Sequence, residues 1–174
     1  NILPFLFSFI GLMIILKAFT ERGDATRAWL LVIAGQLFST LAIALSNENF
    51  GLIPILLYLS GSTIAAVVGF ICLKRIKSAN DAIDLNQFHG HTYEHPKLSV
   101  TFLICCLAFV GLPFTPTFIG IDLMFSHIHK HQEIIIVFTS LSFVFIEIAI
   151  LRIYARIFLG QHKKAYHAIA YRSS

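Results

Sequence analysis

Two acidic residues lie inside long apolar stretches of the sequence, where a charged side chain is costly. Asp122 follows the segment GLPFTPTFIG, and Glu147 lies in the middle of SFVFIEIAILRIYAR. A carboxylate at the centre of a membrane helix costs a few kcal/mol unless it is paired or hydrated. Burial disfavours the anion, whereas nearby water or a cation favours it, so an acid balanced between the two can bind and release a proton. We therefore expect both acids to be stations of a proton pathway, the alternative being acids that only hold helices together.

The segment before Asp122 carries helix-breaking residues at positions that should lie within the membrane. Pro113 and Pro116 each remove a backbone donor and clash with the preceding turn. Gly111 and Gly120 flank the two prolines. We expect the helix to be broken between Gly111 and Pro116, with freed backbone groups that face protein or water, as in the discontinuous helices of transporters. A kink used only for packing is the alternative.

Uncharged polar side chains could hold water between the two acids. The candidates that we include in the pathway are Gln36, Thr115 and Thr117. Small polar residues are also common where membrane helices pack closely, and that alternative stays open for the other hydroxyls of these stretches. They are Ser39, Thr40, Ser60, Ser62 and Thr63.

Other residue types that carry chemistry do not form a recognisable site. The histidines occur as HGHTYEH (His89, His91 and His95) and HIHKH (His127, His129 and His131). Alternating histidines diverge on a helix, so we expect solvated loop histidines and no metal site. Three cysteines lie within apolar runs and are expected to be small buried hydrophobic residues. They are Cys72, Cys105 and Cys106. No dinucleotide, phosphate, iron–sulfur or nucleophile motif is present, so we expect no cofactor and no catalytic residue.

Composition requires that these residues be carried by membrane helices. The 174 residues are 57% hydrophobic and only 13% charged, whereas soluble domains carry about 25% charged residues. We expect an all-α integral membrane bundle of five transmembrane helices, the fourth discontinuous, forming one transmembrane domain over residues 1–174. Because the chain begins with Asn1 and is already apolar at Ile2, it is expected to be part of a longer protein. The expected spans are residues 2–19, 27–45, 51–73, 98–125 and 133–159.

The basic residues predict the orientation of these spans. They gather around residues 20–26, around the loop 74–97 and in the tail, whereas Lys130 is alone on the other side. Short cytoplasmic loops hold an excess of lysine and arginine. We expect the N-terminus outside, the loop 74–97 and the C-terminus in the cytoplasm, and a location in a bacterial inner membrane. Trp29, near the start of the second span, is expected at the membrane interface.

The segment GLPFTPTFIGIDLMF resembles the broken helix of the antiporter-like membrane subunits of complex I, Mrp antiporters and membrane hydrogenases. The residues that match the family pattern are Gly111, Leu112, Pro113, Phe118 and Gly120. The resemblance implies that the five spans are helices nine to thirteen of a longer subunit, which form the second of two inverted five-helix repeats. It also implies proton or cation/proton translocation in a complex such as NADH:quinone oxidoreductase, whose other membrane subunits are the partners.

The sequence departs from the family at Ile121, where a lysine or glutamate usually carries the proton. Asp122 is one residue later, and one step turns a side chain by roughly 100° around a helix. The ion path is therefore either rebuilt around Asp122 or lost. Two alternatives to a proton-pumping subunit remain open, namely the membrane subunit of an inorganic-carbon uptake system and a membrane scaffold that conducts nothing.

Overall fold

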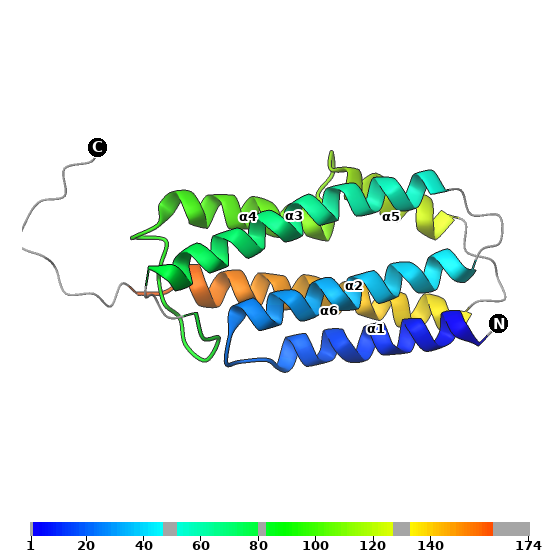
Figure 1. Cartoon of the computed structure of the whole chain (residues 1–174), viewed down its shortest axis with the longest axis horizontal. Coiled ribbons are helices and arrows are strands. Elements are labelled where there is room, and N and C mark those ends of the chain that lie inside the picture. Colours follow the sequence, from blue (N-terminus) through cyan, green and yellow to red (C-terminus); the bar gives the residue numbers. More distant parts are fainter. Residues whose placement is uncertain (1, 47–51, 80–82, 127–132, 162–174) are drawn as a thin grey trace, which may run out of the picture.

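The structure is a computed structural model in which every described element is a helix. It describes residues 2–46, 52–79, 83–126 and 133–161, and these contain no strand. The helices run side by side along the long axis of the molecule (Figure 1). This confirms the all-α class. The helices are α1 (Leu3–Thr20), α2 (Ala25–Ser46), α3 (Leu52–Ser78), α4 (Pro96–Val110), α5 (Pro116–Ser126) and α6 (Glu133–Phe158).

Four of the helices are long and apolar enough to cross a membrane, namely α1, α2, α3 and α6. They contain 18, 22, 27 and 26 residues. At about 1.5 Å per residue they measure about 27 to 40 Å, against a hydrocarbon core of about 30 Å. α4 is a shorter apolar helix, and the residues 98–125, which were expected to form one long span, fall in two separate helices, α4 and α5. Together these helices make the chain an integral membrane protein.

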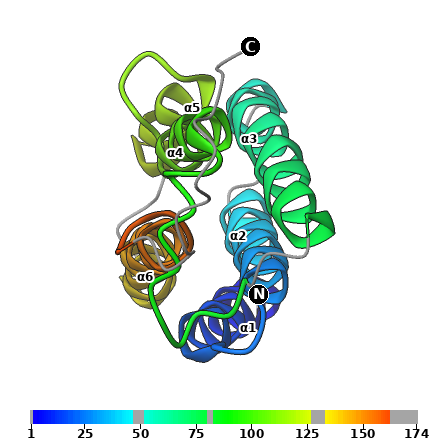
Figure 2. The same cartoon turned by 90° about the vertical axis from the view of Figure 1, so that its left-hand side faces the viewer.

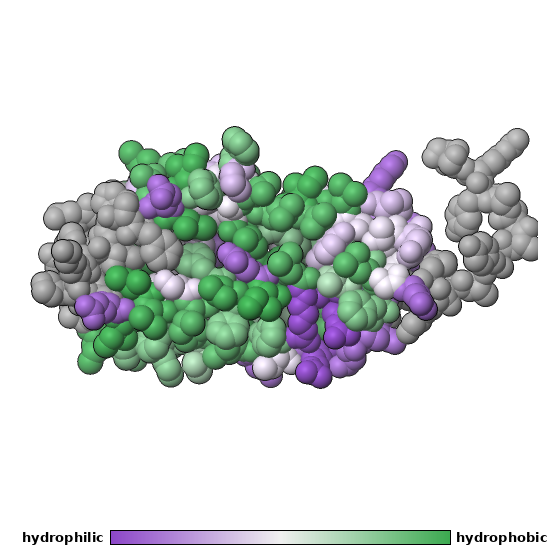
Figure 3. All heavy atoms as spheres, turned by 180° about the vertical axis from the view of Figure 1, so that it is seen from behind, coloured by the Kyte–Doolittle hydropathy of each residue, from purple (hydrophilic) through white to green (hydrophobic). Residues whose placement is uncertain are grey.

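Viewed along the long axis of the molecule, the helices form one elongated bundle (Figure 2). α1 packs against α2, and α6 contacts α1, α2 and α4. α3 contacts α2 and also packs along both α4 and α5. The outward sides are rich in exposed large hydrophobic residues, and Figure 3 shows them covering much of the face seen from behind. Such a surface suits helices that are surrounded by lipid or by other membrane helices.

Trp29 lies in the core of the bundle, so its expected place at the membrane interface is wrong. Its side chain is fully buried, and its indole N–H donates to the carbonyl of Ala66 at 3.0 Å. The ring packs against Phe102 and Phe109, with centroids 5.0 and 5.6 Å away. It also rests on Gly69, where an added Cβ would come within 2.4 Å of the indole. An internal acceptor satisfies the one polar atom of the ring, and the ring can therefore be buried.

One end of the bundle is closed by the chain between α3 and α4, which we call the cap (residues 83–95). Four backbone N–H groups of the cap donate to carbonyls at or just beyond the end of α6, which would otherwise lack partners. The pairs are His89 with Arg156, His91 with Ile157, Thr92 with Phe158 and Gly90 with Leu159. The cap also bonds the start of α2, where Ala25 donates to Ile83, and the α1–α2 loop, where Arg22 accepts from Leu85.

His89 and His91 of the cap are packed and not solvated, contrary to the expectation from the sequence, whereas His95 is half-buried. His91 is only 7% exposed, and its ring stacks on that of His89 at 5.3 Å. The Nε2 atom of His89 lies 3.1 Å from the Asp84 carboxylate. No group of three or more possible metal ligands occurs among the described residues. The second cluster, His127, His129 and His131, lies outside them.

Several charged side chains at this end make ion pairs or bond loop carbonyls. α3 continues through its basic cluster to Ser78, past its expected end at Leu73, and Lys77 reaches Asp24 at 2.8 Å. Partial burial opposes ionisation of Asp24, but hydrogen bonds from Lys77 and Thr26 outweigh it and hold the pKa of Asp24 below its ordinary value.

Two arginines of α6 are bound at the same end. Arg152 donates to the carbonyls of Phe19 and Glu21, and Arg156 donates to that of Asn86. Each guanidinium also lies over a ring, Arg152 over Phe19 at 5.4 Å and Arg156 over Phe88 at 4.3 Å. All three cysteines are free and buried, as the sequence predicts.

Candidate functional site

The chain between α4 and α5 is not helical, and it lies beside the middle of α3 (Figure 1). α4 ends at Val110 because Gly111 takes the left-handed conformation, with φ of 92°, which suits a residue without a Cβ. Pro116 is the first residue of α5, a position where its missing N–H removes no helical hydrogen bond. Pro113 lies in the connection between the two helices.

Two residues of this segment have local roles that the sequence did not reveal. The Thr115 hydroxyl donates to the Leu112 carbonyl at 2.7 Å and accepts from the Phe118 N–H at 3.4 Å, so Thr115 caps the start of α5. Phe114 is fully exposed and has a φ of 82°, an uncommon value for a bulky residue. The segment therefore bulges outward from the bundle.

α5 approaches α3 unusually closely, and two glycines make this possible. A Cβ at Gly120 would lie 2.5 to 2.6 Å from the Tyr58 Cβ, Cα and N atoms. A Cβ at Gly61 would lie 2.4 Å from the Thr117 hydroxyl oxygen. Gly120, which the sequence assigned to the helix break, therefore lies within α5 and serves helix packing.

Beside this contact the bundle buries a set of uncharged polar groups, which we call the Tyr58 cluster (Gln36, Thr40, Tyr58 and Ser62). The Tyr58 side chain is fully buried, and its oxygen accepts a hydrogen bond from Gln36 Nε2 at 2.5 Å. The Thr40 hydroxyl interacts with the same phenol and donates to the Gln36 carbonyl at 2.9 Å. Ser62 donates to the Tyr58 carbonyl at 2.9 Å. The cluster joins α2 to α3.

Sequence reasoning found Gln36 but missed Tyr58, which is the centre of the cluster. The signal was present, because Tyr58 is the one tyrosine inside the apolar run of α3 and precedes Ser62 by one helical turn. Apolar side chains close around the phenol. Ile43 belongs to the same core, Phe143 meets the phenol ring edge-on at 6.3 Å, and Ile121 packs against them.

Thr117 adds a buried polar side chain on α5 to those that α2 and α3 provide. It is fully buried against Gly61, and its hydroxyl has no hydrogen-bond partner among the described residues. Ser39 on α2 has a similarly buried hydroxyl without a partner in the same part of the chain. A hydroxyl both donates and accepts, so each can bind a water molecule or a further polar group.

The two acids do not join this interior set. Asp122 is exposed on α5, two residues after Gly120 and so on the side away from α3. It lies four residues, or about 6 Å along the axis, before the last residue of α5. Glu147 is exposed near the middle of α6. Neither carboxylate makes a hydrogen bond or ion pair within the described residues.

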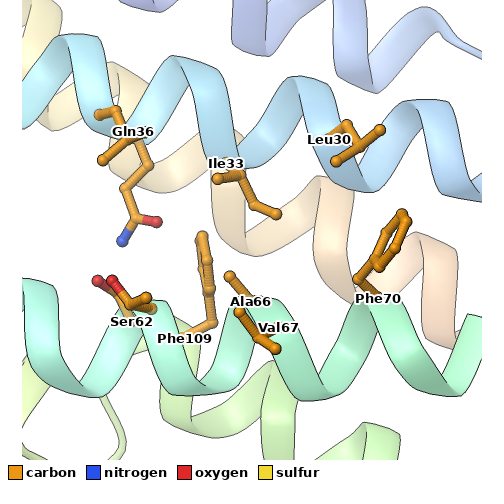
Figure 4. A pocket seen from close by; sticks show the side chains of 10 residues that line it. Leu30, Ile33, Gln36, Ser62, Ala66, Val67, Phe70 and Phe109 are labelled. Atoms are coloured by element: carbon orange, nitrogen blue, oxygen red, sulfur yellow. The ribbon is translucent and has the colours of Figure 1, made fainter.

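A groove between α2 and α3 reaches the Tyr58 cluster from outside. Its volume is ≈ 330 Å³, and its lining is apolar except for Gln36, Ser62 and Thr63. Figure 4 shows Gln36 extending from α2 toward Ser62 on α3, with Phe109 of α4 behind them. The interior polar groups therefore lie next to an opening on the outer surface.

Comparison with known families identifies the family to which this helical bundle belongs. The family model described as NADH:quinone oxidoreductase/Mrp antiporter, TM, matches residues 33–147, more than half of the chain. The match includes the Tyr58 cluster, the segment between α4 and α5, and both acids. No curated protein and no solved structure matches the chain. The chain therefore belongs to the NADH:quinone oxidoreductase/Mrp antiporter family of cation/proton antiporter-like membrane subunits.

Proposed function

We propose that the chain translocates protons, or exchanges a cation for protons, as a subunit of a larger complex such as NADH:quinone oxidoreductase. The observation that carries the proposal is the Tyr58 cluster, buried beside the α4–α5 connection in a member of this family. Phenol and hydroxyl groups both donate and accept hydrogen bonds, so a proton can pass along them and any bound water by hopping. Partner membrane subunits supply the driving chemistry, and the chain itself needs no cofactor.

In this proposal α4 and α5 form one discontinuous span, the fourth of five. Support comes from α3, which has 27 residues, measures about 40 Å and packs along both. α4 and α5 have 15 and 11 residues, so they measure about 22 and about 16 Å. Their combined length is close to that of α3. The five spans then make the second five-helix repeat, helices nine to thirteen, of a longer subunit.

The proposed orientation places the capped end of the bundle in the cytoplasm of a bacterial cell. Support comes from the positions of lysine and arginine, since every one in the described residues lies at that end. The N-terminus is then outside, the loop 74–97 and the C-terminus are inside, and the membrane is the inner membrane.

The pathway proposed here uses Gln36, Tyr58 and Thr117 inside the bundle and Asp122 and Glu147 on its outer surface. The interior residues relay protons along α2, α3 and α5. The acids exchange protons between this interior and the neighbouring elements of the complex. Thr115 contributes by capping α5 and so holds Thr117 in place.

A membrane scaffold that conducts nothing is the second candidate, and one observation favours it. Both acids face outward, and Ile121, at the family's usual position for a proton-carrying residue, packs as an apolar side chain against the core around Tyr58. In a scaffold, the Tyr58 cluster would only join α2 to α3.

Replacing one hydroxyl distinguishes the two candidates. Tyr58→Phe removes the phenol oxygen and keeps the ring, so we expect proton transport by the intact complex in reconstituted vesicles to fall several-fold. Tyr154→Phe is the matched control, because its phenol lies at the capped end, 3.3 Å from the Ser99 hydroxyl. Both variants should assemble. Transport at the parental rate in an assembled Tyr58→Phe complex would favour the scaffold.

A further inference from the structure

Glu147 is the described acid that lies farthest from both ends of its helix, and no described residue pairs with it. It comes 14 residues after Glu133 and 11 before Phe158, so it lies about 21 and about 16 Å along the axis from the two ends of α6. A glutamate side chain is too short to reach either membrane surface from there. A charge at this depth must be paired, hydrated or neutralised.

The side of α6 that carries Glu147 faces away from the bundle. Val144 and Leu151, one turn before and one turn after it, are 50% and 49% exposed. Ile148 is 45% exposed. On the inward side, Ile146 and Ile150 are buried in the core. The view from behind in Figure 3 shows a largely hydrophobic face, with many of its hydrophilic residues gathered toward one end.

The basic residues of the described chain cannot pair with Glu147. They all lie at the capped end, and the two on α6 are occupied there. Arg152 is five residues along α6 from Glu147, about 140° around the helix, and it donates to the carbonyls of Phe19 and Glu21. Arg156 is bound to the Asn86 carbonyl and the Phe88 ring. A cation that pairs with Glu147 therefore comes from outside the described residues.

We propose that the outward face of α6 around Glu147 is a contact surface for another transmembrane helix, which carries a lysine or arginine near its midpoint. Charge complementarity identifies this partner, because the exposed residues next to the carboxylate, Val144, Ile148 and Leu151, are all apolar and Glu147 is the one charged group among them. The neighbouring residues Val144, Ile148 and Leu151 provide the apolar contact on either side of the ion pair. The proposal deepens the proposed function, since Glu147 is one of its stations.

Replacing Glu147 by leucine tests the proposal, because assembly of the complex should fall if the face contacts a basic helix and should not fall if the face contacts lipid. If α6 faced lipid here, Glu147→Leu would remove a polar group from lipid and leave assembly unchanged or improved. If the face contacts a basic partner helix, Glu147→Leu leaves that cation unpaired. We then expect the share of the chain recovered in the intact complex, measured on native gels, to fall several-fold. Glu147→Asp keeps the charge and should retain assembly, and Val144→Leu on the same face is the apolar control.

A second measurement identifies the partner's charge. Glu147→Lys should disrupt assembly, and selection for restored assembly should return acidic or neutral replacements of a basic residue within another transmembrane helix. Assembly of Glu147→Leu at the parental level would overturn the proposal. Failure of the Glu147→Leu chain to accumulate in the membrane when it is expressed without its complex would also overturn it. If Glu147→Leu assembles normally but transports protons more slowly, the proposed helix contact is wrong and the proposed function still stands.

Discussion

The two ends of the bundle differ in how many of their charged and polar side chains have partners. At the capped end, Asp24 is paired with Lys77 and Asp84 with His89, and the arginines of α6 bond loop carbonyls. Around the α3–α5 contact, Tyr58 is buried among neutral groups, Thr117 has an unpartnered hydroxyl, and Asp122 faces outward. The capped end pairs most of these groups within the described residues, although the Thr26 hydroxyl is buried there without a partner among them. The other half has hydrogen-bonding capacity left for water, protons or a neighbouring chain.

The largest expected effect comes from separating α5 from α3. Gly120→Val places side-chain atoms where the Tyr58 backbone already lies, and backbone cannot move aside as a side chain can. We expect a loss of about 3 kcal/mol in the free energy of unfolding, because overpacking in a close contact costs this order of energy. Thermal unfolding of the purified protein in detergent measures it. Gly23→Val, in the exposed α1–α2 loop, is the control, and an equal loss in both variants would contradict the special role of the α3–α5 contact.

The next prediction concerns the outward-facing half directly. Asp122→Asn keeps the size and hydrogen bonding of the side chain but cannot ionise, so we expect assembled complexes to pump protons much more slowly in dye-quenching assays. Glu133→Gln, which neutralises an exposed acid in the first turn of α6, should leave pumping unchanged. Parental pumping by Asp122→Asn would remove Asp122 from the pathway.

The sequence predicted the all-helical class, the apolar helices long enough to cross a membrane and the family, because these depend on apolar length and on the proline and glycine motif. It did not predict which face of each helix is inside. All the helices carry apolar residues on every side, and the period that reveals a buried face in soluble proteins is therefore weak. For this reason the outward positions of Asp122 and Glu147 were not visible in the sequence.

Trp29, Tyr58 and His91 escaped prediction for a related reason. Each is an amphipathic or polar side chain. Trp29 was expected at the membrane interface, Tyr58 was not singled out, and His91 was expected to face solvent. Trp29 and Tyr58 are buried because partners from a distant part of the chain satisfy their polar atoms. His91 is buried because its segment packs across the end of α6. Only the tertiary structure supplies these contacts.

A small effect is expected at the capped end. Lys77→Met removes the partner of Asp24, and because the Lys77 side chain is 57% exposed the pair is worth at most about 1 kcal/mol. The lowered pKa of Asp24 means that this stabilisation is present above its ordinary value of 3.8 and is lost as the pH falls through the lower folded value. Thermal unfolding should therefore distinguish Lys77→Met from the parent at pH 7 but not in strong acid. A difference that persists unchanged in acid would exclude the ion pair as its cause.

Replacing Thr117 by valine tests most directly whether the α3–α5 contact conducts protons or only packs. The Thr117 hydroxyl is buried and has no partner among the described residues, so Thr117→Val should leave the thermal stability of the complex unchanged or raised. If the hydroxyl is a station of the pathway, proton transport in reconstituted vesicles falls several-fold in the same variant. Unchanged or higher stability together with slower transport is the predicted result. Transport at the parental rate, with the complex intact, would contradict a proton pathway through this contact.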